Sequence, residues 1–214
     1  PLFLASALFF GVSATTFAQD NLVNSLKLNA SEKSKEAFTF TDVINLENTS
    51  IKNQGSSGTC WSYSANSFLE SEMIRMGKKP VELSQIFSAR NAYLEKARMY
   101  VRMHGAVALG EGGQFHDVIN MYRKYGAVPQ SVYTGLNYGT DKNKFSEMST
   151  ILDGMLAAII KNPNGKLTPN WDKAYAAVLD SYLGEVPKKF KHNGKEYTPE
   201  TFAKEVVGIN PDDY

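Results

Sequence analysis

The feature that most constrains this chain is its single cysteine, Cys60, which directly follows a short loop rich in glycine and serine. After it the sequence has a helical pattern, with apolar residues expected on one stripe at Tyr63, Phe68, Leu69, Met73 and Met76. Cys60 is therefore predicted at or near a helix N-terminus. Backbone N–H groups and the helix dipole favour an anion there, and such a position is known to lower the pKa of a cysteine thiol.

The loop before Cys60 suits a second role. Gln54 lies six positions earlier, from where its amide can turn back toward the thiol and, with the Cys60 backbone N–H, bind a developing oxyanion. Gly55 and Gly58 allow a tight turn, and Trp61 supplies an apolar wall. The alternative is that Cys60 is a small buried hydrophobic residue, which is the common fate of free cysteines.

The ordered set Gln54, Gly58, Cys60 and Trp61, followed by small residues at 64 and 65, resembles the nucleophile signature of papain-like cysteine peptidases. The run Asn-Gln-Gly-Ser-Ser-Gly-Thr-Cys-Trp is most similar to the bleomycin hydrolase and aminopeptidase C branch. The resemblance implies that Cys60 attacks a peptide carbonyl while Gln54 helps to hold the oxyanion. It implies neither a metal nor an organic cofactor.

A second stretch, the glycine cluster at residues 110–113, precedes another helical pattern. Gly112 and Gly113 resemble the family's glycine pair, whose backbone pairs with an extended substrate. The resemblance thus makes Gly112, Gly113 and Trp61 candidate substrate-binding residues. An ordinary glycine-rich turn is the alternative. A phosphate-binding loop is disfavoured, because no Lys-Ser or Lys-Thr pair follows.

Local signals predict the other elements. A short strand is expected within residues 38–46, and helices at about 84–103 (with Ser84 as N-cap), 145–161 and 170–182. Asn193-Gly194 predicts a hairpin, and Thr198-Pro199 the start of a short helix. The charged side of the helix at 84–103 is expected to face solvent, with Arg90, Glu95, Lys96, Arg98 and Arg102.

The resemblance implies an α+β papain-like fold. We expect its mostly α-helical left-hand domain to be present and its β-rich right-hand domain to be absent from this chain. The helical nucleophile domain would span residues 40–214, with an inserted helical region at about 132–184, after an N-terminal arm at 19–39.

The first residues predict export. Residues 1–12 are apolar and small residues lead to Ala18, the pattern of a truncated signal peptide over residues 1–18 that is cleaved after Ala18. The run is too short for a membrane span. We therefore expect a periplasmic or extracellular protein; a buried N-terminal helix is the alternative.

The balance of charged residues limits the kinds of partner that this protein is expected to bind. There are 23 basic and 22 acidic residues, a net charge of +1 and no basic run, which disfavours nucleic acid. The expected partner is a peptide substrate, with no membrane partner after processing and with a homo-oligomer left open.

A thiolate peptidase needs a base, usually histidine. None of the three histidines, His104, His116 and His192, has a suitable context, and in the family the histidine and asparagine lie far downstream. The resemblance therefore predicts that the base lies beyond Tyr214 and that this fragment alone is inactive. The alternative is a non-catalytic papain-like module that binds a peptide or a partner. A metal site ranks behind both, because the cysteine and histidines show no ligand spacing.

Overall fold

The computed structural model describes residues 41–162 and 165–214. The chain forms two compact units, Pro1–Asn45 and Leu46–Tyr214, and the description below concerns the second. The predicted signal peptide (1–18) and N-terminal arm (19–39) lie outside the described residues. Among the described helices none is both long enough and apolar enough to cross a membrane.

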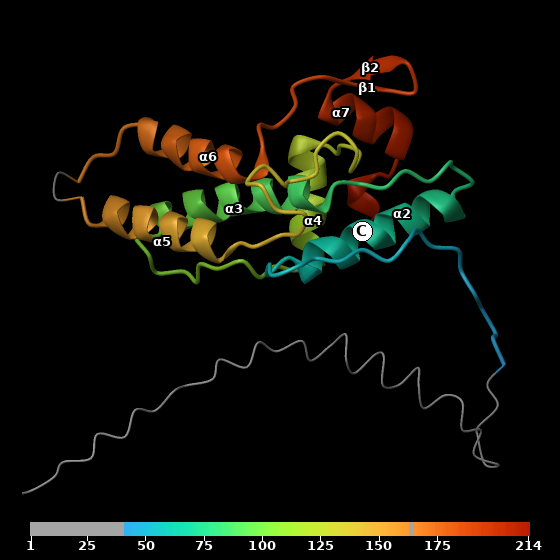
Figure 1. Ribbon diagram of the computed structural model, residues 1–214, viewed down its shortest axis with the longest axis horizontal. Coiled ribbons are helices and arrows are strands. Elements are labelled where there is room, and N and C mark those ends of the chain that lie inside the picture. The colour runs from blue at the N-terminus through green and yellow to red at the C-terminus, as the bar shows by residue number, and fades with distance from the viewer. Residues whose placement is uncertain (1–40, 163–164) are drawn as a thin grey trace, which may run out of the picture. The chain divides into compact units, whose positions relative to one another are not determined.

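The second unit is built mainly of helices, which Figure 1 shows arranged around α3. In chain order they are α2 (Cys60–Arg75), α3 (Gln85–Arg102), α4 (Phe115–Tyr125), α5 (Ser146–Ile160) and α6 (Asn170–Leu183). They are followed by β1 (Phe190–His192), β2 (Lys195–Tyr197), α7 (Pro199–Phe202), the π-helix η1 (Ala203–Val207) and the 3-10 helix η2 (Pro211–Asp213). Helix α3 contacts α2, α4, α5 and α6, so it is the centre of the unit.

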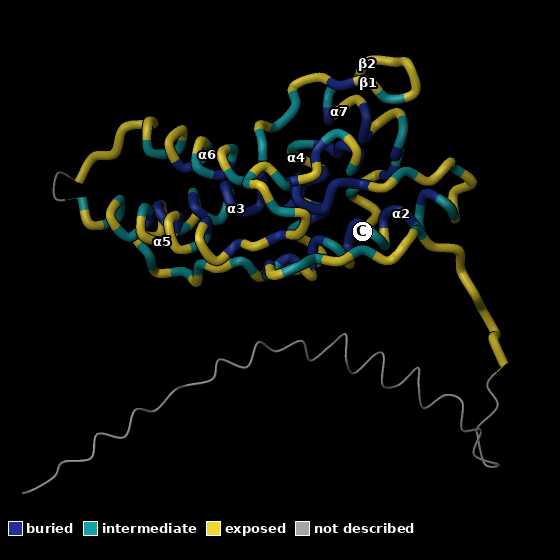
Figure 2. The backbone as a smooth tube through the Cα atoms, viewed as in Figure 1, coloured by how far each residue is buried: buried dark blue, intermediate teal, exposed yellow. Residues whose placement is uncertain are grey.

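Most of α3 is buried, as Figure 2 shows. The helix begins where the sequence predicted, because the Ser84 hydroxyl accepts a hydrogen bond from the Phe87 N–H at 3.1 Å. Phe87, Ile86 and Ala97 are almost fully buried along it. Residues 85–94 are buried on every side because other helices pack around this one.

The other local predictions are largely confirmed. Helices α5 and α6 and the short helix α7 lie within a residue or two of the predicted ranges. The hairpin turns at Asn193 and Gly194, both with positive φ, 49° and 80°. The predicted strand at 38–46 is wrong for the part that is described, because residues 41–46 form no strand.

The predicted apolar stripe of α2 is partly wrong. Leu69 and Met73 are buried, but Phe68 and Met76 are 41% and 43% exposed. The buried face instead follows Trp61, Ala65, Leu69 and Met73 and includes polar residues, Ser62, Asn66 and Glu70. Those polar side chains hydrogen-bond inside the protein, so hydrophobicity alone does not mark the face.

Glu70 shows how such a group is satisfied. Its fully buried carboxylate accepts hydrogen bonds from the Leu83 N–H at 2.7 Å and the Thr49 hydroxyl, and pairs with the Lys52 ammonium at 2.9 Å. A buried charge with three partners is tolerated, whereas an unpaired one is costly. Glu70 thereby binds the segment that precedes α2 in the sequence and the segment that follows it to that helix.

The solvated charged face predicted for α3 is also wrong in part. Arg90 is buried and pairs with Asp180 of α6 at 2.7 Å.

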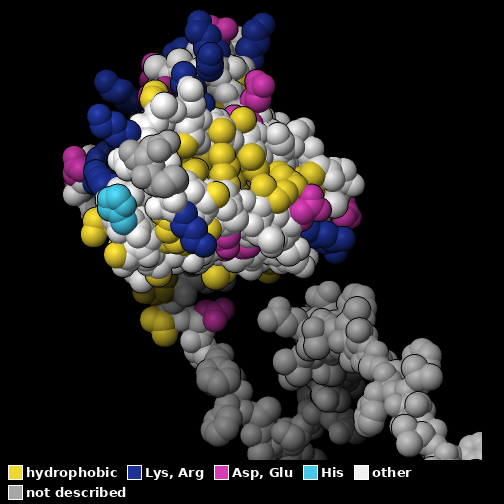
Figure 3. Space-filling view, turned by 90° about the vertical axis from the view of Figure 1, so that its left-hand side faces the viewer, with side chains coloured by type: hydrophobic (Ala, Val, Ile, Leu, Met, Phe, Trp, Pro, Cys, Tyr) yellow, Lys and Arg dark blue, Asp and Glu magenta, His cyan; other side chains and the backbone are white. Residues whose placement is uncertain are grey.

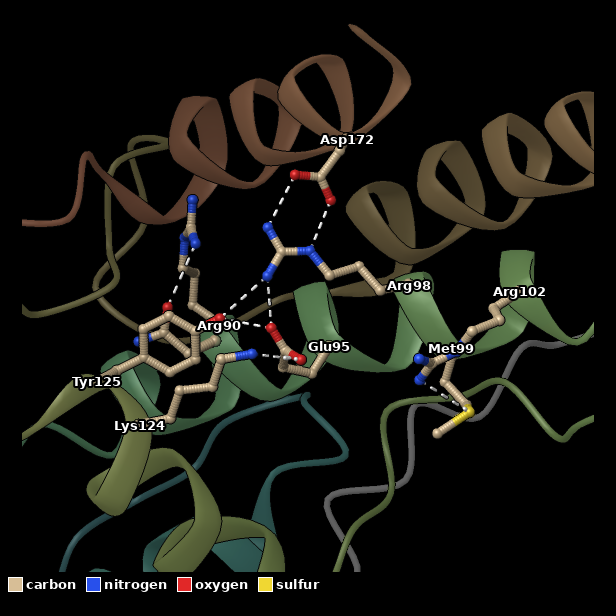
Figure 4. A network of polar contacts seen from close by, with 9 residues as sticks. Arg90, Glu95, Arg98, Met99, Arg102, Lys124, Tyr125 and Asp172 are labelled. Carbon is tan, nitrogen blue, oxygen red and sulfur yellow. Dashed lines mark hydrogen bonds and ion pairs between the residues drawn. The ribbon is translucent and has the colours of Figure 1, made fainter. Parts of the chain in front are cut away.

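Arg98 binds Asp172 of α6 through two nitrogens at 2.7 and 2.8 Å, and it also contacts Glu95 (Figure 4). Glu95 pairs in turn with Lys124 at 2.9 Å and accepts a hydrogen bond from the Tyr125 hydroxyl. These charges join α3, α4 and α6, since a long helix at the centre has little free surface.

The face at the α5–α6 end carries exposed hydrophobic side chains. Figure 3 shows hydrophobic side chains gathered at its centre and charged side chains around them.

The Arg98–Asp172 pair makes a pH-dependent contribution to stability. The hydrogen bonds from Arg98 lower the pKa of Asp172, so protonation of Asp172 removes a contribution that is present above about pH 4 and is lost as the pH falls below it. Asp172→Asn should lower the free energy of unfolding by about 1 kcal/mol at pH 7 and by much less near pH 2. Urea unfolding at both pH values, with Asp141→Asn as an exposed control, checks this. An equal loss at both would contradict it.

Candidate active site

Cys60 is the first residue of α2, and its side chain is exposed, as the loop-helix pattern predicted. Thr59 is the N-cap residue, but its side chain makes no capping hydrogen bond; its hydroxyl pairs instead with that of Ser57 at 2.5 Å. The first turn therefore keeps N–H groups that its cap does not occupy. A helix start of this kind favours an anionic sulfur or oxygen.

Two hydrogen bonds between Gln54 and Ser57 hold the loop before Cys60 in a turn. The Gln54 amide donates to the Ser57 carbonyl at 2.7 Å, and the Ser57 hydroxyl donates to the Gln54 carbonyl at 2.8 Å. Gly55 has φ +62°, which accounts for glycine at that position. The Gln54 amide has two N–H groups, and only one is needed for the bond to Ser57. No hydrogen bond joins Gln54 to Cys60 in the described part of the chain, so its oxyanion role stays a prediction.

Glu111 connects the glycine segment to this loop. Its carboxylate accepts hydrogen bonds from the Gly58 N–H and from the Ser149 hydroxyl of α5, and its backbone carbonyl accepts one from the Trp61 indole at 2.9 Å. Sequence reasoning did not single out Glu111. The available signal was a lone carboxylate within a run of glycines, which does not reveal a partner 53 residues away.

Trp61 and Gly113, two of the candidate substrate-binding residues, are in contact. A Cβ atom on Gly113 would lie 2.7 Å from the Trp61 ring, whereas one on Gly112 would meet nothing within 4 Å. The Lys96 ammonium binds the Gly112 carbonyl and lies 5.5 Å from the centre of the Trp61 ring. Burial lowers the pKa of Lys96, partly offset by Asp117. Trp61 is only 7% exposed, so it mainly supports the glycine segment, and its contact with substrate stays a prediction.

None of the three histidines hydrogen-bonds to Cys60. His192 lies in the hairpin, next to Asn193 at 3.1 Å and edge-on to Phe202. His116 lies 3.7 Å from Asp117 on α4, and His104 has a positive φ of 50° after the end of α3. His192 and His116 thus have local contacts of their own.

The two glycines make a matched pair for testing this packing. Gly113→Ala should lower the free energy of unfolding by about 1 to 3 kcal/mol, because the new methyl group overlaps the Trp61 ring. Gly112→Ala should change it by less than about 0.5 kcal/mol, since the space there is open. Denaturant unfolding followed by tryptophan fluorescence measures both. Equal effects would show that the glycine segment does not rest on Trp61.

Comparison with known proteins supports the resemblance to papain-like cysteine peptidases. Residues 5–162 match the model of the Peptidase C1-like family. The chain is 28% identical to cysteine proteinase 1, mitochondrial, of Saccharomyces cerevisiae, over 59% of this chain and 29% of that protein. It is 27% identical to aminopeptidase C of Lactobacillus delbrueckii subsp. lactis, over 96% of this chain and 53% of that protein.

A solved structure shares the architecture. The crystal structure of PepW from Lactobacillus rhamnosis superposes with a TM-score of 0.59 and 25% identity, covering 93% of this chain and 54% of that one. The chain thus spans about half the length of aminopeptidase C and PepW, or less of the yeast protein. The helix-rich, papain-like fold is thereby supported, while the absence of a β-rich domain stays a prediction. The chain belongs to the Peptidase C1-like family of cysteine peptidases, in the branch that resembles bleomycin hydrolase and aminopeptidase C.

Proposed function

We propose that the protein containing this chain is a cysteine peptidase of the aminopeptidase or bleomycin hydrolase type. The observation that carries the proposal is an exposed sulfur at the first residue of α2, beside a loop closed by Gln54. Access to solvent and a helix N-terminus together are one of the settings in which a cysteine is reactive. The substrate class is peptides, bound along Gly112 and Gly113 without metal or organic cofactor.

The reaction is nucleophilic acyl transfer. The Cys60 sulfur bonds to the peptide carbonyl carbon, and the oxygen becomes an anion between the Cys60 N–H and the Gln54 amide. Collapse of this intermediate breaks the C–N bond, and the amine leaves with the proton that a base took from the thiol. Water then hydrolyses the thioester. The proposal places the base outside these 214 residues, because none of their three histidines contacts Cys60.

We also propose that the protein is exported, on the basis of the apolar run at residues 1–12. Export of the complete protein with a mature N-terminus at Gln19 would support this, and retention of the complete protein inside the cell would count against it.

A second candidate function is peptide binding without hydrolysis. Its support is that same lack of a histidine beside Cys60. The two candidates differ in one observable: the peptidase consumes a peptide through Cys60, and the binding module retains it unchanged.

Alkylation tests the nucleophile directly, because Cys60 is the only cysteine of this chain. In the complete protein at pH 7, iodoacetamide should modify Cys60 about tenfold faster than free cysteine, since the sulfur is exposed at the first residue of α2. Mass spectrometry locates the adduct, and Cys60→Ala is the control. A rate equal to that of free cysteine would contradict the proposal.

A further inference from the structure

The segment Asn143–Phe145, just before α5, lies along the nucleophile loop. The Ser56 N–H donates to the Asn143 carbonyl at 2.8 Å, and the Phe145 N–H donates to the Ser56 carbonyl at 3.1 Å. Gly55 comes so close that a Cβ atom there would lie 2.6 Å from the Asn143 carbonyl oxygen. Phe145 is fully buried and packs edge-on against Tyr93 of α3. The core of the unit therefore anchors this segment against the loop.

The Asn143 side chain makes a second set of contacts. It is only 4% exposed, and its amide nitrogen donates to the Gln54 carbonyl at 3.2 Å and to the Tyr63 hydroxyl oxygen at 2.9 Å. Tyr63 lies in the first turn of α2, three residues after Cys60. One buried amide thus joins the residue proposed to bind the oxyanion to the helix that carries the nucleophile.

We propose that Asn143 is a positioning residue that fixes Gln54 relative to Cys60; this rests on the proposed function. Oxyanion stabilisation depends on a donor held in place before charge develops. The Gln54 backbone carbonyl accepts hydrogen bonds from Asn143 and Ser57, and the Gln54 side-chain amide donates to the Ser57 carbonyl, so both ends of the residue are held. The segment before α5, which the sequence predicts only as part of an inserted helical region, thereby has a role in the reaction.

The sharpest variant is Asn143→Asp, which keeps the shape of the side chain but replaces both donated N–H groups with an oxygen. The carboxylate would face the Gln54 carbonyl oxygen, and two acceptors repel each other. Asn137→Asp is the control for the same chemical change at an exposed position, because Asn137 donates to the Ser181 carbonyl on α6 and belongs to no part of the proposed site. Asn143→Ser, which removes the amide without adding charge, serves if the aspartate variant does not fold.

The experiment measures hydrolysis of a fluorogenic peptide by the complete protein, with Asn143→Asp tested alone and combined with Gln54→Ala. Alone, it should lower kcat about tenfold or more with little change in KM, because the loss lies in the transition state. In the Gln54→Ala background it should cost less than about twofold, since the donor that it positions is gone. Asn137→Asp should retain the wild-type kcat.

The outcomes separate the two proposals. Loss of kcat by the same factor in both backgrounds would show a merely structural role for Asn143 and overturn this inference. So would wild-type activity of Asn143→Asp. If the unmutated protein fails to hydrolyse peptides, the proposed function is overturned, and the role of Asn143 with it.

Discussion

The proposed site depends on the hydrogen bond between the Glu111 carboxylate and the Gly58 N–H. A hydrogen bond from a backbone N–H donor to a charged acceptor is shorter and stronger than one to a neutral acceptor. Here it holds the nucleophile loop against the glycine segment, while the second carboxylate oxygen of Glu111 binds Ser149 of α5. Gly58 is required in this arrangement, since a Cβ atom would lie 2.6 Å from that of Glu111. The loop, the glycine segment and α5 consequently form one assembly.

The rest of α2 is fixed by similar means. The Ser62 hydroxyl donates to the Gln85 carbonyl at 2.7 Å, and Glu70 holds Leu83, Thr49 and Lys52. Buried polar groups with complete sets of partners specify one arrangement, because any shift would leave a group unpaired. The result is a rigid scaffold that ends in an exposed sulfur. Rigid support beneath an accessible nucleophile is what preorganised acyl-transfer chemistry requires.

Local signals in the sequence predicted much of the fold. Ser84 marked the start of α3, Asn193-Gly194 the hairpin turn, and the loop before Cys60 the start of α2, because caps and turns depend on neighbouring residues. The contacts of Glu111 and Asn143 were not predictable, since they join residues that lie 38 to 89 positions apart in the sequence. The charged residues of α3 misled for the same reason: only the packed helices reveal that Arg98 faces Asp172.

The family signature supplied the candidate residues, and the structure shows which of them touch. Trp61 and Gly113 meet, and Gln54 closes its own loop. What a motif cannot give is the second layer of contacts that orients these groups, namely Glu111, Asn143 and Lys96. Such supporting groups decide whether a catalytic geometry is held closely enough to work.

The central claim is that Cys60 adds to a carbonyl whose oxygen the Gln54 amide then binds. The most direct measurement is the carbon-13 NMR spectrum of a peptide aldehyde, labelled at its carbonyl carbon, bound to the complete protein. The account predicts the resonance of a tetrahedral hemithioacetal with the wild-type protein, weaker binding with Gln54→Ala and none of that resonance with Cys60→Ala. A spectrum that shows only the free aldehyde and its hydrate with the wild-type protein would contradict the account.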